Sequence, residues 1–380
     1  MSEKKNTPVI DADEILRGIR EWVNIESPSN DGKSVNRQVD AVEKGAAKIG
    51  AVIERIPGRD GYGDILKVRT PWGGDGPGIL VLSHLDTVHP HGTIDNQNPY
   101  RREGDKVFGP GIYDMKSGAY IAYYAYQHLV RLGQETPLPI TFVYVPEEEV
   151  GSPTSQVMIE IEARKSKYAL VTEPARDGGK IVTARRGAMR FQIATRGRPA
   201  HSGLCHINGR SAIKEMARQI VRLEEITDYG RGVTANVGLI KGGTGCNVIP
   251  EHCSIELDVR IDNMDQAREI EVMVHAYKSF DQDVELIIEG GLNRPPYEKD
   301  KGITKLFEHA KNLASEIGFT LEDVKTGGGS DGNFTAAAGV PTLDGLGADG
   351  NGAHTHEEFI YYSSLVERTQ LMLRLFETLE

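Results

Sequence analysis

The chain has 380 residues, of which 39% are hydrophobic and 26% are charged, and its formal net charge is −11. No segment reaches the roughly 18 consecutive apolar residues of a membrane-spanning helix. The acidic balance, with no basic runs and no basic residues interleaved with aromatics, argues against a nucleic-acid partner. One hydrophobic core does not comfortably support a chain of this length, so we expect two domains.

The location of the protein is predicted from its first residues and its cysteines. The start, MSEKKNTPVIDADEILRGIREWV, is charged and then helical in pattern, and it lacks the apolar core of a signal peptide. Cys205, Cys246 and Cys253 are an odd number without the CxxC spacing of zinc sites, which suits small buried hydrophobes in a reducing compartment. We therefore expect a cytoplasmic protein that does not contact a membrane.

Helices alternate with short apolar strands in the first half of the chain. Helical spacing of apolar residues predicts helices over residues 13–25, 35–49, 115–132 and 154–164. Short apolar runs predict strands over residues 51–56, 65–68, 79–83, 140–145 and 168–172. This alternation favours an α/β domain with a mixed, mostly parallel sheet that is covered on both faces.

The pattern changes near Arg186. AMRFQIAT and SIELDVRI alternate as half-buried strands do, a helix is predicted over residues 211–225, and another helix precedes VELIIEG. Long helices return over residues 303–317 and 363–377. We predict a two-layer α+β domain at residues 186–294, inserted into a larger α/β domain made of residues 1–185 plus 295–380.

Ionisable residues follow the predicted strands of the larger domain. His84 and Asp86 come directly after ILVLS, and two positions apart in an extended chain they share a face, so the aspartate can orient the imidazole. Asp114 in FGPGIYDMKSG, Glu147 to Glu149 in VYVPEEEVGS and Glu173 in LVTEPA lie in similar places. Carboxylates that converge at one sheet edge repel one another unless a cation neutralises them.

A late glycine-rich loop, GADGNGAHTHEEF, adds His354 and His356. Imidazoles with carboxylates and no cysteine form a nitrogen and oxygen donor set that suits Zn²⁺, Mn²⁺ or Co²⁺. Zinc is the leading candidate. We expect His89, His91 and His356 to be surface residues.

The motifs SHLDTV, GPGIYDMKSG, EEEVGS, TEP, RPAHSG, GCNVIP, LDVR, GGGSDG and GAHTHEE occur in this order. Together they resemble the co-catalytic zinc metallopeptidase and deacylase family of glutamate carboxypeptidase, succinyl-diaminopimelate desuccinylase, acetylornithine deacetylase and aminoacylase. The bacterial glutamate carboxypeptidase branch is the most similar. The resemblance implies a mixed-sheet, zinc-exopeptidase-like catalytic domain with an inserted ferredoxin-like lid and dimerisation domain.

The resemblance also implies roles for individual residues. It assigns two zinc ions per subunit, with Co²⁺ or Mn²⁺ as substitutes, and a cis peptide bond between Asp114 and Met115. The implied metal ligands are His84, Asp114 as the bridging group, Glu149, Glu173 and His354. The implied catalytic residues are Glu148 as general base, Asp86 beside His84, and His201, which in a homodimer reaches the active site of the other subunit. The implied substrate-binding residues are Asn247, Arg260, Arg294, Gly328, Gly329 and Ser330.

The predicted reaction is cleavage of an N-acyl or peptidyl amino acid next to its C-terminal carboxylate, because an arginine fork binds a carboxylate through two hydrogen bonds. The substrate is therefore a small N-acyl amino acid or dipeptide-like molecule. Three alternatives stay open: an N-deacylase of a small metabolite, an aminopeptidase, and a metal-dependent binding protein without catalysis. The register among the three consecutive glutamates is uncertain by one residue.

Overall fold

The computed structural model describes residues 9–74 and 76–380, which form two compact units. Of the described residues, the first unit comprises those up to residue 184 together with 299–325 and 330–380, and the second comprises residues 185–298 and 326–329. Within the described residues, no helix is both long and apolar enough to cross a bilayer.

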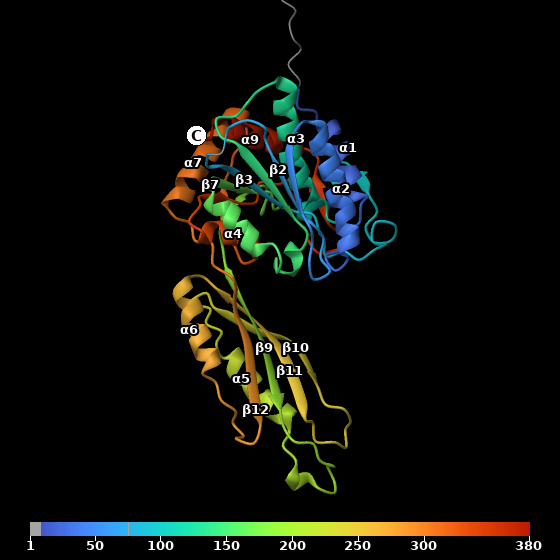
Figure 1. Ribbon diagram of the computed structural model, residues 1–380, viewed down its shortest axis with the longest axis vertical. Helices are drawn as coiled ribbons and strands as arrows, with labels where there is room; N and C mark the ends of the chain where they lie inside the picture. The colour runs from blue at the N-terminus through green and yellow to red at the C-terminus, as the bar shows by residue number, and fades with distance from the viewer. Residues whose placement is uncertain (1–8, 75) are drawn as a thin grey trace, which may run out of the picture. The chain divides into compact units, whose positions relative to one another are not determined.

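A six-stranded mixed sheet forms the centre of the first unit (Figure 1). Its strands, in spatial order, are β1 (Val52–Ile56), β2 (Ile65–Arg69), β6 (Ile140–Val145), β3 (Gly78–His84), β7 (Ser166–Val171) and β14 (Thr342–Leu343). The strands β6, β3, β7 and β14 run parallel, whereas β1 and β2 pair antiparallel. The carboxyl ends of β6, β3 and β7 therefore lie at one edge of the sheet.

Helices cover both faces of this sheet, which confirms the α/β prediction. One face packs against α1 (Ala12–Val23), α2 (Gly32–Lys48), α3 (Ser117–Leu132), α7 (Lys301–Ile317) and α9 (Ser364–Thr378). The other face packs against α4 (Gln156–Arg164) and α8 (Gly332–Ala337). Successive residues of β3 alternate between these two cores: Ile79 and Val81 belong to the first, and Leu80 and Leu82 to the second. A central strand that is buried on both faces explains the continuous apolar run in the sequence.

Two smaller sheets complete the first part of the fold. The first contains, in spatial order, β15 (Gly350–Asn351), β16 (Phe359–Tyr361), β5 (Lys106–Phe108) and β4 (Arg101–Glu103). The second pairs β8 (Ile181–Arg185) with β13 (Asp323–Thr326). The β15–β16 pair brings the late loop of the sequence beside the segment that follows β5.

The second unit is a two-layer α+β sandwich, as predicted. Its antiparallel sheet contains, in spatial order, β10 (Thr234–Gly242), β11 (His252–Ile261), β9 (Gly187–Arg196) and β12 (Glu285–Arg294). The helices α5 (Ala212–Glu224) and α6 (Met264–His275) lie along this sheet (Figure 1). The strand β10 was not predicted; most of its residues are exposed, and a bulge lies between Val237 and Leu239.

Candidate metal centre

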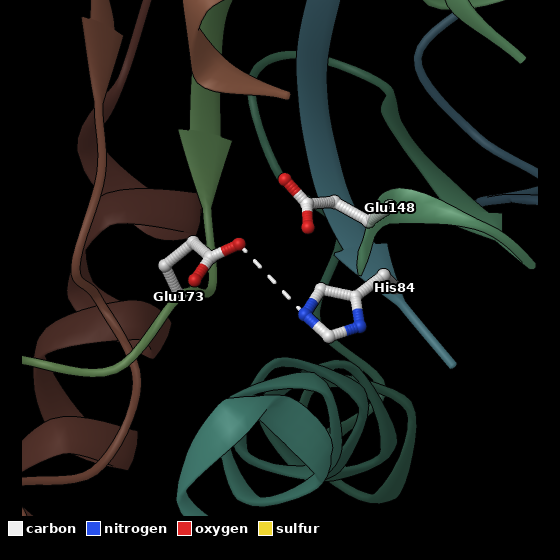
Figure 2. Close-up of side chains that lie close together, drawn as sticks. All are labelled: His84, Glu148 and Glu173. Atoms are coloured by element: carbon white, nitrogen blue, oxygen red, sulfur yellow. Dashed lines mark ion pairs between the residues drawn. The ribbon is translucent and has the colours of Figure 1, made fainter. Parts of the chain in front are cut away.

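Three adjacent parallel strands deliver ionisable side chains to one place. His84 is the last residue of β3, Glu148 begins a short 3-10 helix after β6, and Glu173 follows β7 by two residues. Figure 2 shows the three side chains directed toward a common point, and one potential ligand atom from each lies within 4.8 Å of the others. The convergence expected from the sequence is therefore present in the folded chain.

A second group of potential ligand atoms shares His84. One atom each from His84, Asp114 and Glu149 lie within 4.8 Å of one another. The Nε2 atom of His84 lies 3.1 Å from Asp114 Oδ1 and 3.8 Å from Glu173 Oε1. Asp114 lies in the π-helical segment Ile112–Lys116 before α3, and its peptide bond to Met115 is cis, as the resemblance implied.

The late loop adds one histidine to this cluster. His354 Nε2 lies 3.1 Å from Glu149 Oε2 and 3.4 Å from Asp114 Oδ2, so its ring faces both carboxylates. His356, two residues later, is exposed. The loop thus brings only the first of its two histidines to the carboxylates.

Asp86 is fully buried and contacts both the ring of His84 and the main chain of Glu148 and Glu149. The ring of His84 is oriented through Nδ1, which lies 3.0 Å from the main-chain oxygen of Asp86 and 3.4 Å from its carboxylate. The carboxylate accepts hydrogen bonds from the main-chain N–H groups of Glu148 and Glu149, and from the Ser29 hydroxyl at 2.6 Å. A donor hydrogen on Nδ1 leaves the Nε2 lone pair of His84 free to bind a cation.

Opposite charges shift the pKa values of the cluster. Burial disfavours charge on His84, but its hydrogen bonds with Asp114 and Asp86 raise its pKa well above the ordinary value. Hydrogen bonds with Asp114 and Glu149 raise the pKa of His354 to about 10. Burial opposes ionisation of Asp114, but the two histidines lower its pKa, whereas burial raises the pKa of Glu149. In the absence of a metal, these raised histidine pKa values favour the protonated imidazoles beside the carboxylates.

This donor set fits divalent cations. Glu149 Oε1 is buried and has no hydrogen-bond partner within the described parts of the chain, which is costly for a carboxylate oxygen unless a cation or water satisfies it. Two imidazoles and several carboxylates in close contact, without cysteine, match the preferences of Zn²⁺, Mn²⁺ and Co²⁺. The cluster is therefore a candidate site for a divalent metal ion.

Two of the predicted catalytic and substrate-binding residues lie on adjoining loops of the second unit. His201 and Asn247 are both exposed, and the main-chain oxygen of Asn247 accepts a hydrogen bond from the N–H of Ser202. His201 Nδ1 accepts hydrogen bonds from the N–H groups of Gly203 and Leu204 at 3.1 and 3.2 Å. An acceptor role for Nδ1 places the hydrogen of a neutral ring on Nε2, where it can be donated to another group.

The remaining predicted substrate-binding residues differ in exposure. Arg260 is half-buried, and its Nε and Nη2 atoms donate to both carboxylate oxygens of Asp258, at 2.7 and 3.1 Å. Arg294, at the end of β12, is buried. The main-chain oxygens of Gly328 and Gly329 accept hydrogen bonds from Arg185 Nη1. Ser330 belongs to the first unit, is fully buried, and donates its hydroxyl to Asp344 Oδ2 at 2.5 Å.

The sequence did not predict the buried polar side chains that contact Asp86 and Glu358. His89 was expected at the surface, but it is buried. Its Nε2 atom lies 2.6 Å from the carboxylate of the buried Glu358, and this polar contact satisfies the ring inside the protein. Ser29 is buried where its hydroxyl contacts Asp86. The sequence predicts ionisable residues that directly follow a strand. The contacts of Ser29 with Asp86 and of His89 with Glu358 join segments that are distant in the sequence, so no local pattern indicates them. The expected surface positions of His91 and His356 are confirmed.

The parallel strands of the mixed sheet thus lead into one histidine and two glutamates, which is the donor set of a candidate metal site. The model of peptidase family M20/M25/M40 matches residues 80–378, and the chain belongs to this family. It is 29% identical to carboxypeptidase G2 of Pseudomonas sp. (strain RS-16) over 371 residues, which cover 95% of this chain and 88% of that protein. It is 27% identical to a probable carboxypeptidase of Arthroderma benhamiae over 240 residues, covering 58% of this chain and 51% of that protein.

Solved structures support the fold. The aminopeptidase PepT of Bacillus cereus superposes with a TM-score of 0.74 at 24% identity, covering 97% of this chain and 98% of that one. The M20 family metallo-carboxypeptidase Sso-CP2 of Sulfolobus solfataricus superposes with a TM-score of 0.71 at 16% identity, covering 97% and 100%. The fold of this chain is therefore shared by an aminopeptidase and by a metallo-carboxypeptidase.

Proposed function

We propose that the protein is a two-metal amidohydrolase that cleaves an N-acyl or peptidyl amino acid next to its C-terminal carboxylate, and that it releases glutamate or a similar acidic residue. The main support is the close grouping of His84, Asp114, Glu149, Glu173 and His354 at one edge of the sheet. The similarity to carboxypeptidase G2 over 95% of the chain favours the carboxypeptidase reaction.

In this proposal the residues that would hold two zinc ions are His84, Asp114, Glu149, Glu173 and His354. When bound, two divalent cations supply positive charge that favours ionisation of water and polarises the scissile carbonyl. Glu148 takes a proton from the attacking water, the new carbon–oxygen bond forms, and the carbon–nitrogen bond breaks as the proton passes to the leaving nitrogen. Asp86 keeps the Glu148 main chain in place through its 3.1 Å hydrogen bond.

We assign the remaining roles to residues of the second unit and to Ser330 of the first. The Nε2–H of His201 would stabilise the oxyanion of the tetrahedral intermediate from the partner subunit of a homodimer. Asn247, Arg294 and the main chain at Gly328 and Gly329 would contact the substrate. Since the Ser330 hydroxyl is already used by Asp344, its contribution would be to the shape of this loop.

Arg260 is proposed to bind the substrate carboxylate. Its pair with Asp258 uses the Nε side of the guanidinium, so a substrate carboxylate would take the Nη1 side. We expect Arg260→Met to lower kcat/KM by roughly 10- to 100-fold for a substrate with a free C-terminal carboxylate, which corresponds to the ~1.5–3 kcal/mol of a charged hydrogen bond. The matching carboxamide substrate should show little change.

The control for this experiment is Arg268→Met, because Arg268 is an exposed arginine of the same unit that also pairs with an aspartate, Asp265. Steady-state kinetics with both substrates would be compared for the three proteins. An equal loss for carboxylate and carboxamide would remove Arg260 from carboxylate recognition.

The proposed homodimer has a candidate contact at β10, which is an edge strand of its sheet. Leu239 and Ile240 on this strand are 54% and 57% exposed, and an apolar strand edge favours pairing with another strand. We expect Leu239→Glu to shift the protein toward the monomer in sedimentation velocity. Val272→Glu, at an exposed aliphatic residue of α6, should leave the sedimentation unchanged, and a dimer that tolerates both changes would place the interface elsewhere.

The direct test of the proposed function is hydrolysis by the zinc- or cobalt-loaded protein of N-acyl amino acids whose leaving residue is Glu, Asp, Ala, Lys or ornithine. Selective release of glutamate or aspartate is expected. Preference for one acyl group with any leaving residue would indicate an N-deacylase, and cleavage that requires a free amino terminus would indicate an aminopeptidase. Two bound metals without turnover of any substrate would leave a binding protein.

A further inference from the structure

Glu358 is a fully buried carboxylate outside the proposed ligand set. Its Oε1 atom accepts hydrogen bonds from the main-chain N–H groups of Tyr113 at 2.8 Å and Asp114 at 2.9 Å. Its Oε2 atom accepts a hydrogen bond from the N–H of Gly111 at 2.8 Å and lies 2.6 Å from His89 Nε2. One side chain thus binds three amides of the short segment that carries Asp114.

This segment needs an acceptor from elsewhere in the chain. Asp114 and Met115 have non-helical backbone angles, with φ −115° and ψ 97° at Asp114, and Gly111 is left-handed with φ +68°. Amides in such a turn are not all satisfied by local helical hydrogen bonds, and a buried N–H without an acceptor is costly. A carboxylate forms stronger bonds to main-chain N–H groups than a neutral acceptor does.

The same late segment therefore reaches the cluster in two ways. His354 contacts Asp114 Oδ2 and Glu149 Oε2 through its ring, and Glu358, four residues later, binds the Asp114 main chain. The segment ends at β16, whose pairing with β5 and β15 fixes its position. A displacement of Glu358 would be transmitted to the Asp114 backbone and thus to the position of its carboxylate.

We propose that Glu358, supported by His89, is a positioning residue that sets the Asp114 carboxylate for metal binding. This inference rests on the proposed function, because it takes Asp114 as a ligand. Glu358 acts through the main chain of residues 111–114 and does not itself contact the metal. His89 supplies a fourth donor to the carboxylate, at 2.6 Å.

The test compares Glu358→Gln with Glu357→Gln. The change Glu358→Gln keeps the size of the side chain, but the NH₂ group that replaces one carboxylate oxygen cannot accept a hydrogen bond from an amide. Glu357 is the adjacent glutamate and is exposed. Each protein is stripped of metal and titrated with Co²⁺, with the affinity determined by competition with a chelator and the coordination followed by visible absorption. Thermal unfolding of each metal-free protein is recorded separately.

We expect Glu358→Gln to lose about 10- to 100-fold in Co²⁺ affinity with an altered absorption spectrum, since outer-shell partners of metal ligands have effects of this size. Glu357→Gln should match the unchanged protein. If Glu358→Gln lowers only the unfolding temperature, and its Co²⁺ affinity and spectrum are unchanged, the residue is structural and the inference is wrong. Failure of the unchanged protein to bind Co²⁺ would instead contradict the proposed function.

If Glu358→Gln does not fold, His89→Gln provides the second variant, because it removes the imidazole ring that lies 2.6 Å from the carboxylate. A smaller loss of Co²⁺ affinity in the same direction is expected. Unchanged affinity and spectrum in His89→Gln would overturn the proposed support of Glu358 by His89.

Discussion

Replacement of Glu148 by glutamine is expected to lower kcat on an N-acyl glutamate by about 10²- to 10⁴-fold, the usual contribution of a general base. Glutamine has the same shape, and the hydrogen bond from its main-chain N–H to Asp86 would persist. Its amide cannot take a proton from water. Metal content measured by elemental analysis should remain at the level of the unchanged protein.

The same experiment resolves which of the adjacent glutamates is the ligand. Glu148 groups with His84 and Glu173, and Glu149 groups with His84 and Asp114, so distance alone leaves both as potential ligands. His354 contacts Glu149, which favours Glu149 as the ligand. We expect Glu149→Gln to lose metal as well as activity. A Glu148→Gln protein that loses metal while Glu149→Gln retains it would reverse these two roles.

A suitable control is Glu357→Gln, whose side chain is exposed outside the cluster. It should keep both metal content and kcat. Near-normal kcat in Glu148→Gln, with full metal content, would contradict the role of Glu148 as the base.

The general architecture was predictable because its signals are local. Apolar runs such as Ile79 to Leu82 predict a strand buried on both faces, and helical spacing predicts the helices that cover it. The ends of β3, β6 and β7 are defined by the same runs, so His84, Glu148 and Glu173 could be placed at one edge before any distance was known. The missed strand β10 shows the limit of this approach, since most of its residues are exposed and it contains no continuous apolar run.

The support of the site was not predictable from local patterns. Glu358 and Asp114, whose main-chain N–H it binds, are 244 positions apart in the sequence. His89 and Glu358 are 269 positions apart. Asp86 contacts the His84 ring as expected, but the hydrogen bonds that its carboxylate accepts from the main chain of Glu148 and Glu149 and from the Ser29 hydroxyl were not predicted. Such contacts depend on how distant segments pack, and a residue's type and its neighbours in sequence do not specify them.

Removal of the metals is expected to destabilise the protein more strongly at high pH than at low pH. Without a metal, the pKa of His354 is raised to about 10 from the ordinary value of 6.5, through its bonds with Asp114 and Glu149. The folded state therefore binds more protons than the unfolded state between these values. The stabilisation that the His354 proton gives to the metal-free folded state is complete below pH 6.5 and is lost as the pH rises through about 10.

Metal binding follows the opposite trend, because His354 and His84 must lose their protons to become ligands, so the affinity rises with pH. The difference in unfolding temperature between metal-loaded and chelator-treated protein should thus widen from pH 6 to pH 9, which calorimetry can measure. His354→Asn should flatten this pH dependence, whereas His356→Asn, at the exposed histidine two residues later, should preserve it. A difference that is constant or narrows with pH would mean that these histidine protons are not exchanged for metal, and the ligand assignment of His354 would fail with it.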